Sequence, residues 1–224
     1  MHSATDLNCG RGYEWELMRA ARARNPDILL YGLPWGFPAF LGDGDAKARQ
    51  GTALSKPSAK DGTPGGDTVD YIVSWVGCAT RHNLTIDILG VWNEMDSAFA
   101  ASGVAYIKLL RQRLDAAGHT TTRLVGGDVH SWDPASKIGA DPVLRSSLYA
   151  LCRHYPSTQS DPDADATGMP LWSSEDYAAD NSNEGGRCAA RIINQNFVKG
   201  NMSATVMWNL ISVSTPFHSA HPHE

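Results

Sequence analysis

Short apolar runs alternate with amphipathic segments along most of the chain, and this alternation limits the possible folds more than any other feature. An apolar run of about four to eight residues bounded by turn residues is typical of a buried strand, whereas apolar residues three or four apart indicate a helix. Strands that alternate with helices are typical of a parallel α/β sheet. We expect strands at 27–35, 86–93, 123–127, 148–154, 171–174 and 205–210, and helices at 11–24, 69–82, 103–117 and 184–199.

The residues at the ends of these runs distinguish between the two common parallel architectures. No G-x-G-x-x-G motif follows an expected strand, so the signature of a dinucleotide-binding sheet is missing. Polar and aromatic residues instead collect where the strands end, and in a (β/α) barrel the chemistry lies at the carboxyl ends of the strands. The sequence therefore predicts an α/β chain of the (β/α)-barrel type, with strand ends near Trp35, Glu94, Asp128, His154, Glu175 and Asn209.

One segment, 42–68, interrupts the alternation. It is polar and rich in Gly, Pro and Lys, with few residues that a core would bury. Connections of this kind usually run over the surface, so we expect an exposed loop inserted after the first strand. We expect no domain boundary there.

Composition and charge exclude several classes of partner. The chain has 224 residues, 42% of them hydrophobic, and Lys+Arg 19 against Asp+Glu 24 gives a net charge of −5. No short window is rich in Lys or Arg, so we expect no nucleic-acid partner. The longest apolar stretch, 28–41, is broken by Gly and Pro and falls short of the roughly 20 residues that span a bilayer. We therefore expect no integral membrane segment, and no secretory signal is recognisable in residues 1–12.

Two glutamates stand at the ends of expected strands. Glu94 follows the run ILGVWN, and Glu175 follows PLWSS 81 residues later. On a barrel both would point into one mouth. A retaining glycosidase needs a carboxylic acid to protonate the leaving oxygen and a carboxylate to attack the anomeric carbon, about 5–5.5 Å apart. The alternative is that each glutamate is a solvated charge or lies beside a helix N-terminus, as is common at strand ends.

Other strand-end residues could contact a sugar. Asn93 could hydrogen-bond the hydroxyl next to the reacting carbon, and Trp35 and Trp208 offer flat faces for a sugar ring. His154 and Tyr155 could touch the sugar or satisfy a hydrogen bond in the core, and the sequence favours neither. Asp128 is a weaker candidate of the same kind.

Several longer motifs resemble a known family. The motifs RGYEWELM, NPDILLYGLPWGFPAFLG, DILGVWNE, YIKLLR, HYPST, LWSSEDY, RIINQNFVKG and VMWNL are similar to those of the galactocerebrosidase family of retaining glycoside hydrolases, over residues 1 to about 213. The resemblance implies that Glu94 is the acid/base and Glu175 the nucleophile. It also implies that Asn93, Trp35 and Trp208 line a galactose pocket.

The resemblance further implies an activity and a setting. The expected reaction is hydrolysis of the β-galactosyl bond of galactosylceramide with retention, through a covalent galactosyl-enzyme intermediate. The family works in the acidic lysosome with a saposin-type lipid-presenting partner, so a lysosomal or secreted location is expected. No cofactor and no metal is implied. Acid conditions suit the chemistry, because the acid/base must be protonated while the nucleophile is ionised.

The chain also departs from the family. Residue 1 aligns after the family's second barrel strand, which implies an incomplete (β/α)8 TIM-type barrel with about strands 3 to 8 present. We expect residues 1–215 to form this partial catalytic barrel and 216–224 to be a disordered tail. Segment 42–68 differs from the family, and Met95 replaces an expected basic residue. Two alternatives stay open: another retaining β-glycosidase on the same barrel, and an inactive or merely glycan- or lipid-binding fragment.

Weaker signals concern metals and cysteines. The run Asp161–Asp165 lacks the Gly and Glu that a calcium loop needs, and His218, His221 and His223 favour adventitious metal binding only. The four cysteines form no C-x-x-C pair and are few for a disulfide scaffold. The resemblance implies that Cys188 pairs with a cysteine beyond this sequence.

Four further residues are expected to be structural. Trp15, Trp75 and Tyr106 fall in expected helices, where core packing is more common than ligand binding. Asp176 would point to the side of its strand opposite Glu175, and we expect a helix cap or an ion pair there.

Overall fold

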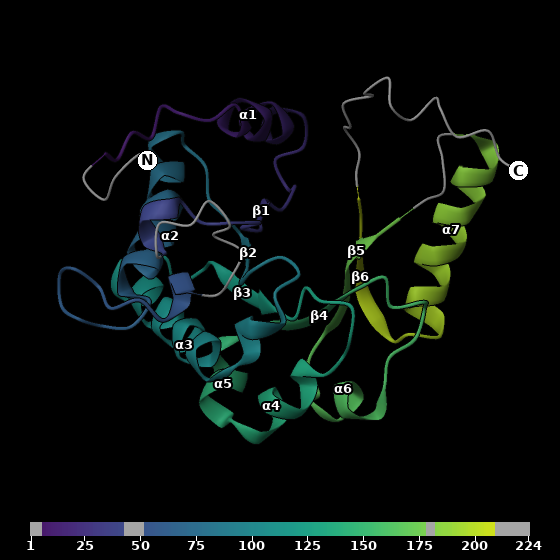
Figure 1. The fold of residues 1–224 in the computed structure, drawn as a ribbon. Helices are drawn as coiled ribbons and strands as arrows, with labels where there is room; N and C mark the ends of the chain where they lie inside the picture. Colours follow the sequence, from purple (N-terminus) through teal and green to yellow (C-terminus); the bar gives the residue numbers. More distant parts are fainter. Residues whose placement is uncertain (1–5, 43–51, 178–181, 209–224) are drawn as a thin grey trace, which may run out of the picture.

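Six parallel strands form one sheet, and each strand lies beside its neighbours in sequence (Figure 1). The computed structural model describes residues 6–42, 52–177 and 182–208. The strands are β1 Tyr31–Gly32, β2 Ile88–Gly90, β3 Arg123–Gly126, β4 Ala150–His154, β5 Leu171–Asp176 and β6 Met202–Met207. The α-helices are α1 Glu14–Arg24, α2 Gly66–Arg81, α3 Ala101–Ala116, α4 Pro134–Ala140, α5 Pro142–Ser147, α6 Pro162–Ala166 and α7 Asn183–Val198. Short 3-10 helices span Ala39–Leu41, Thr52–Leu54 and Asp96–Phe99.

The predicted alternation is confirmed for all six strands and for the four long helices. The bounds differ by a few residues: α2 begins at Gly66 rather than residue 69, and β6 begins at Met202 rather than residue 205. The short helices α4, α5 and α6 were not predicted. The predicted boundary between 215 and 216, the tail and its three histidines lie outside the described residues.

Apolar side chains cover both faces of the central strands of the sheet, whereas the edge strand β6 is only partly buried. One cluster packs between the sheet and the helices and includes the fully buried Tyr106 and Leu110 of α3. A smaller cluster fills the inner face and is made of Ile88, Val125, Ala150, Cys152 and Trp172. Burial on two faces explains why β2, β3 and the first half of β4 are largely apolar rather than alternating. The core role predicted for Trp15 and Tyr106 is confirmed, and Trp75 packs against the same cluster.

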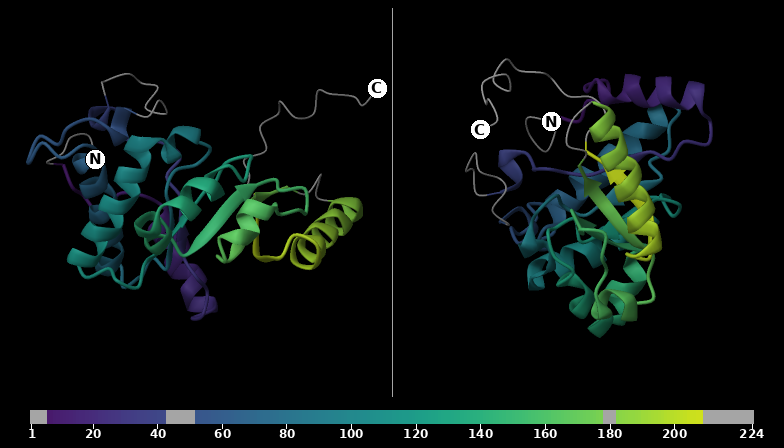
Figure 2. Two further views of the ribbon diagram at one scale, coloured as in Figure 1. Left: turned by 90° about the horizontal axis from the view of Figure 1, so that it is seen from below. Right: turned by 90° about the vertical axis from the view of Figure 1, so that its right-hand side faces the viewer.

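The sheet is curled, so that its two edge strands approach each other beyond their carboxyl ends. Trp35, which follows β1, stacks on Trp208, which follows β6, with ring centroids 6.3 Å apart. Figure 2 shows α2 and α3 together at one end of the sheet and α7 at the other, packed on β6. No helix in the described ranges is long and apolar enough to cross a bilayer.

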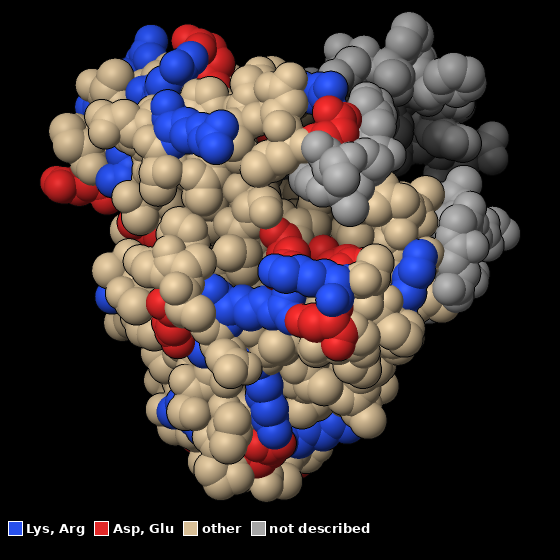
Figure 3. Space-filling view, turned by 90° about the vertical axis from the view of Figure 1, so that its left-hand side faces the viewer, with Lys and Arg blue, Asp and Glu red and all other residues tan. Residues whose placement is uncertain are grey.

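The exposed loop expected at 42–68 is only partly correct for its described residues, because most of 55–64 is exposed but 53–54 and 65–68 are largely buried. Ala53 and Leu54 are buried, and Thr68, also buried, donates its hydroxyl to the Ala53 carbonyl at 2.6 Å. The buried side chains of Ala53 and Leu54 and the hydrogen bond from Thr68 therefore hold the segment against the start of α2. On the adjoining surface, positive and negative side chains lie side by side (Figure 3). Arg113 of α3 pairs there with Asp70 at 2.5 Å and Asp61 at 3.0 Å.

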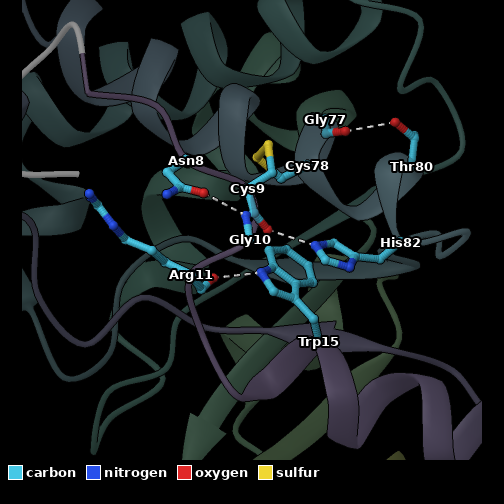
Figure 4. The surroundings of a disulfide bond; sticks show 9 residues. All are labelled: Asn8, Cys9, Gly10, Arg11, Trp15, Gly77, Cys78, Thr80 and His82. Atoms are coloured by element: carbon cyan, nitrogen blue, oxygen red, sulfur yellow. Dashed lines mark hydrogen bonds between the residues drawn. A yellow bond between two sulfur atoms is a disulfide. The ribbon is translucent and has the colours of Figure 1, made fainter.

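A disulfide joins the segment before α1 to α2 (Figure 4). Cys9 and Cys78 are 69 residues apart in sequence. The carbonyl of Cys9 lies 2.6 Å from a ring nitrogen of His82, and Trp15 stacks on that imidazole with centroids 4.9 Å apart. The Trp15 indole N–H also donates to the Arg11 carbonyl at 2.8 Å. The sequence did not predict this bond, since its partners meet only after α2 has packed beside the N-terminal segment.

Candidate active site

Three residues just beyond the strand ends share an unusual backbone conformation. Glu94, Asp128 and Tyr155 have φ values of +52°, +51° and +46°, in the left-handed region that disfavours non-glycine residues. The Glu94 N–H donates to the Asp128 carbonyl, and the Tyr155 N–H donates to the Glu175 carbonyl, both at 2.8 Å. These bonds tie adjacent strand ends together and hold the strained turns. Backbone strain of this kind is found disproportionately at functional sites.

The two sequence-predicted glutamates meet at this edge. Glu94 and Glu175 project from the ends of β2 and β5, and with His154 they offer ligand atoms that all lie within 4.8 Å of one another. The Glu94 side chain is 33% exposed, whereas that of Glu175 is 10% exposed. Oxygens this close are compatible with the short class of carboxylate pairs, about 5–5.5 Å, in which one carboxylate attacks directly.

His154 occupies the space between the carboxylates. Its imidazole is fully buried, with Nδ1 3.3 Å from Glu94 Oε1 and 3.8 Å from Glu175 Oε2. On its other side Nε2 lies 3.8 Å from Asp128 Oδ1, too far for a hydrogen bond. Asp128 Oδ1 accepts a hydrogen bond from the Tyr31 hydroxyl at 3.2 Å. Burial alone lowers the pKa of His154, but Asp128, Glu175 and Glu94 raise it, and the net pKa is raised above its ordinary value. The imidazole is therefore favoured as a cation.

Tyr155 contacts the second glutamate. Its hydroxyl donates a hydrogen bond to Glu175 Oε1. Burial and the Glu175 carboxylate together raise the pKa of Tyr155 well above its usual value, so the phenol keeps its proton at neutral and acid pH. Of the two roles expected for His154 and Tyr155, the structure shows the hydrogen bond within the protein, because each side chain bonds to one of the two carboxylates. A contact with substrate by His154 stays a prediction.

Asn93 and the two tryptophans also lie at the sheet's carboxyl edge. Asn93 is 1% exposed, and neither its amide nitrogen nor its oxygen has a hydrogen-bond partner among the described residues. An unpaired buried amide costs about 1–3 kcal/mol, so it calls for a partner that the described residues do not supply. Trp35 and Trp208 are 48% and 42% exposed, which leaves aromatic surface free beside the carboxylates. Their binding roles stay predictions.

Asp176 differs from its predicted role. Among the described residues its buried carboxylate forms neither a helix cap nor an ion pair, the two expected interactions. It accepts hydrogen bonds from Ser173 at 2.8 Å and from Asn196 of α7 at 3.0 Å. The Asp176 carbonyl also accepts from the Trp208 N–H at 2.7 Å. The residue thus fixes α7 and the Trp208 backbone against β5.

His130 belongs to the site but was missed in the sequence. It lies beyond β3, and its Nε2 is 3.0 Å from Glu94 Oε1. Its ring stacks on Tyr155 with centroids 5.5 Å apart and an interplanar angle of 12°. The only signal was its place two residues after the strand-end Asp128, which does not distinguish a site residue from a surface loop residue.

The donor set also bears on metals. Two carboxylates and an imidazole could ligate a transition metal. In the described structure His154 Nδ1 bonds to Glu94 Oε1 and Tyr155 bonds to Glu175 Oε1, so hydrogen bonds within the protein already occupy part of this donor set. The expectation of a metal-free site stays a prediction, and a chelator would test it. The Asp161–Asp165 run serves another purpose, since Asp161 caps α6 by accepting from the Ala164 N–H.

Comparison with protein families identifies the chain's relatives. A model described as glycosyl hydrolase family 59 matches residues 1–222. The chain belongs to glycosyl hydrolase family 59. This confirms the resemblance that the motifs carried.

Family 59 relatives are much longer than this chain. The galactocerebrosidase of Danio rerio is 41% identical over 213 residues, which cover 95% of this chain and 29% of that protein. The galactocerebrosidase of Homo sapiens is 39% identical over 217 residues, which cover 95% of this chain and 28% of that protein. The chain thus spans less than a third of the length of these relatives.

Solved structures show the fold of this family 59 chain independently. SrfJ from Salmonella typhimurium superposes with a TM-score of 0.69 at 21% identity, covering 94% of this chain and 52% of that one. The catalytic domain of GH30 xylanase C from Talaromyces cellulolyticus superposes with a TM-score of 0.65 at 18% identity, covering 88% of this chain and 50% of that chain. Six consecutive parallel strands in a curled sheet are an incomplete TIM-type barrel, and the predicted fold class is confirmed.

Proposed function

We propose that this chain carries the catalytic carboxylates of a retaining β-galactosidase that hydrolyses galactosylceramide to galactose and ceramide. The observation that carries the proposal is the pair Glu94 and Glu175, which offer oxygens within 4.8 Å of each other at the ends of β2 and β5. That spacing suits direct attack by one carboxylate and proton donation by the other. The galactosyl and ceramide parts of the substrate come from the names of the family 59 relatives.

In the first step the Glu175 carboxylate attacks the anomeric carbon. The bond from that carbon to the leaving oxygen breaks, and the oxygen takes the proton of Glu94. In the second step Glu94, now a carboxylate, removes a proton from water. The resulting hydroxide attacks the anomeric carbon, the ester to Glu175 breaks, and both glutamates regain their first state.

The surrounding residues take supporting roles. The Tyr155 hydroxyl, bonded to Glu175, orients the nucleophile in its resting state. The unpaired Asn93 amide is available to the hydroxyl next to the anomeric carbon, and the stacked Trp35 and Trp208 offer apolar faces to the sugar ring. A lysosomal or secreted location and a saposin-type lipid-presenting partner are proposed on the family relationship alone.

The test is turnover of 4-methylumbelliferyl β-galactoside between about pH 4 and about pH 6 by the full chain. Glu94→Gln and Glu175→Gln are each expected to lower kcat by about 10²–10⁴-fold, because one loses the proton donor and the other the nucleophile. Glu184→Gln is the matched control, since Glu184 is an exposed residue of α7 paired with Arg187. Its activity should equal that of the wild type.

Two further readouts assign the roles. An activated 2-deoxy-2-fluoro galactoside should leave a stable ester, found by peptide mass spectrometry on Glu175. Azide should restore turnover of a dinitrophenyl galactoside in Glu94→Gln, because a small anion can replace the base in the second step. A folded but inactive wild type would overturn the proposal for this chain. Equal turnover of β-glucosides would instead favour another retaining β-glycosidase.

A further inference from the structure

His130 is an imidazole at the site to which the proposed reaction gives no task. Its side chain is 62% exposed and lies above the carboxylates, with Nε2 3.0 Å from Glu94 Oε1. The ring is oriented by two aromatic contacts, because it stacks on Tyr155 at 5.5 Å and meets His154 edge-on at 6.0 Å. An exposed histidine held on two sides is thus fixed against Glu94.

Both histidines meet the same oxygen of Glu94. His154 Nδ1 lies 3.3 Å from Oε1, and His130 Nε2 lies 3.0 Å from it. When both nitrogens carry their protons, the two N–H donors on Oε1 disfavour a proton on that oxygen and leave Oε2 to carry it. The pair therefore fixes which oxygen of the carboxyl group presents a proton to the leaving group.

Glu94 needs such support because its side chain is otherwise loosely held. It is 33% exposed, on a turn with a φ of +52°. A glutamate side chain has substantial rotamer freedom, and acid catalysis requires the proton to lie within hydrogen-bonding reach of the leaving oxygen. Nucleophilic attack by Glu175 makes no such demand on Glu94.

We propose that His130 is a positioning residue for the acid/base, and that it acts by donating Nε2–H to Glu94 Oε1 so that Oε2 faces the leaving group. The inference rests on the proposed function. It predicts that removal of the His130 imidazole lowers kcat/KM by a factor that depends on the leaving group. A poor leaving group needs the proton of Glu94 as its bond to the anomeric carbon breaks, whereas a dinitrophenolate departs without it.

The experiment measures kcat/KM of the full chain for phenyl and 2,4-dinitrophenyl β-galactoside. His130→Ala should lower kcat/KM about tenfold for the phenyl substrate, as loss of one hydrogen bond that holds the acid in place implies, and less than about twofold for the dinitrophenyl substrate. His130→Gln should restore most of the phenyl activity, because its amide can donate to the same oxygen. His119→Ala is the control, since His119 precedes β3 at the opposite end of that strand.

Each outcome of this experiment either supports or overturns the role of His130. A loss confined to the phenyl substrate and rescued by His130→Gln supports the inference. Equal losses on both substrates, or no loss on either, overturn it, because a role through Tyr155 and Glu175 or through folding would not depend on the leaving group. If Glu94→Gln and Glu175→Gln keep wild-type activity, or the folded wild type is inactive, the proposed function fails and the inference fails with it.

Discussion

At the scale of single residues, the site is a set of charges whose states depend on one another. His154 is buried against Asp128, Glu175 and Glu94, and together these groups raise its pKa. A group with a raised pKa in the folded state stabilises that state fully below its unfolded pKa, about 6.5 for histidine. This stabilisation is lost as pH rises through the folded pKa. The free energy of unfolding should therefore fall from slightly acid to mildly alkaline pH.

Asp128→Asn should weaken that dependence, because it removes the partner that contributes most to raising the pKa of His154. Urea unfolding at about pH 5.5 and about pH 8 measures the difference between the two free energies. We expect a smaller difference in Asp128→Asn than in the wild type. Asp133→Asn is the control, because Asp133 is exposed in the loop before α4. An unchanged difference in Asp128→Asn would mean that Asp128 does not govern the imidazole.

Tyr155 offers a second residue-scale prediction. Its hydroxyl donates to Glu175, so Tyr155→Phe leaves the proposed nucleophile with one donor fewer. Loss of a hydrogen bond to a charged group corresponds to a decrease in rate of roughly 10- to 100-fold. We expect kcat for an aryl galactoside to decrease by that factor. Tyr149→Phe is the matched control, since Tyr149 lies beside Trp172 and Arg123 away from the carboxylates. Unchanged kcat in Tyr155→Phe would exclude the orienting role.

At the scale of elements, the close approach of β3 to β4 depends on Gly127. This residue has a φ of +122°, and a Cβ there would lie 1.9 Å from the Cys152 carbonyl oxygen. Gly127→Ala should therefore lower the free energy of unfolding by roughly 3 kcal/mol, as measured in urea. Gly186→Ala is the opposite case, because a Cβ on this exposed helical glycine meets nothing within 4 Å. It should stabilise the protein by about 0.5–1 kcal/mol. An unchanged free energy of unfolding in Gly127→Ala would show that β3 and β4 can move apart at this position.

The elements also show how far the sequence could predict the fold. Helices of 11 to 16 residues and the apolar strands have full periodic patterns, and these were predicted. Helices α4, α5 and α6 have only 5 to 7 residues, too few for a period. Each nevertheless begins with an Asp-Pro pair, and proline at the first helical position is a local signal that the periodic analysis did not use.

The candidate site likewise contains residues that the sequence could predict and residues that it could not. Glu94, Asp128, His154 and Glu175 lie at or just beyond strand ends, so the barrel topology alone predicts that they converge. His130 contacts Glu94 only because the turn at Asp128 and the stacking on Tyr155 direct it there. Neither interaction leaves a periodic or motif signal in the sequence, and the burial of Ala53 and Leu54 in segment 42–68 is hidden for the same reason.

At the scale of the whole molecule, the disulfide joins regions that the sheet alone does not join. Cys9 precedes α1 and Cys78 lies in α2, so the bond encloses β1 and segment 42–68 within one covalent loop. Trp15 adds to this junction by stacking on His82 and on Trp75. The edge that carries Trp35 is thereby held to the helices that pack on β2 and β3.

Removal of this bond gives the whole-molecule prediction. Closing a loop with a sequence separation of 69 restricts the unfolded chain by roughly 4 kcal/mol in the chain-entropy model, and measured values are commonly about 2–4 kcal/mol. The double variant Cys9→Ser with Cys78→Ser should lose about that much free energy of unfolding, measured in urea without reductant. Cys188→Ser is the control, because Cys188 is a free cysteine. The wild type treated with reductant should match the double variant. If both keep the wild-type free energy of unfolding, the junction is stabilised by the aromatic stack rather than by the covalent bond.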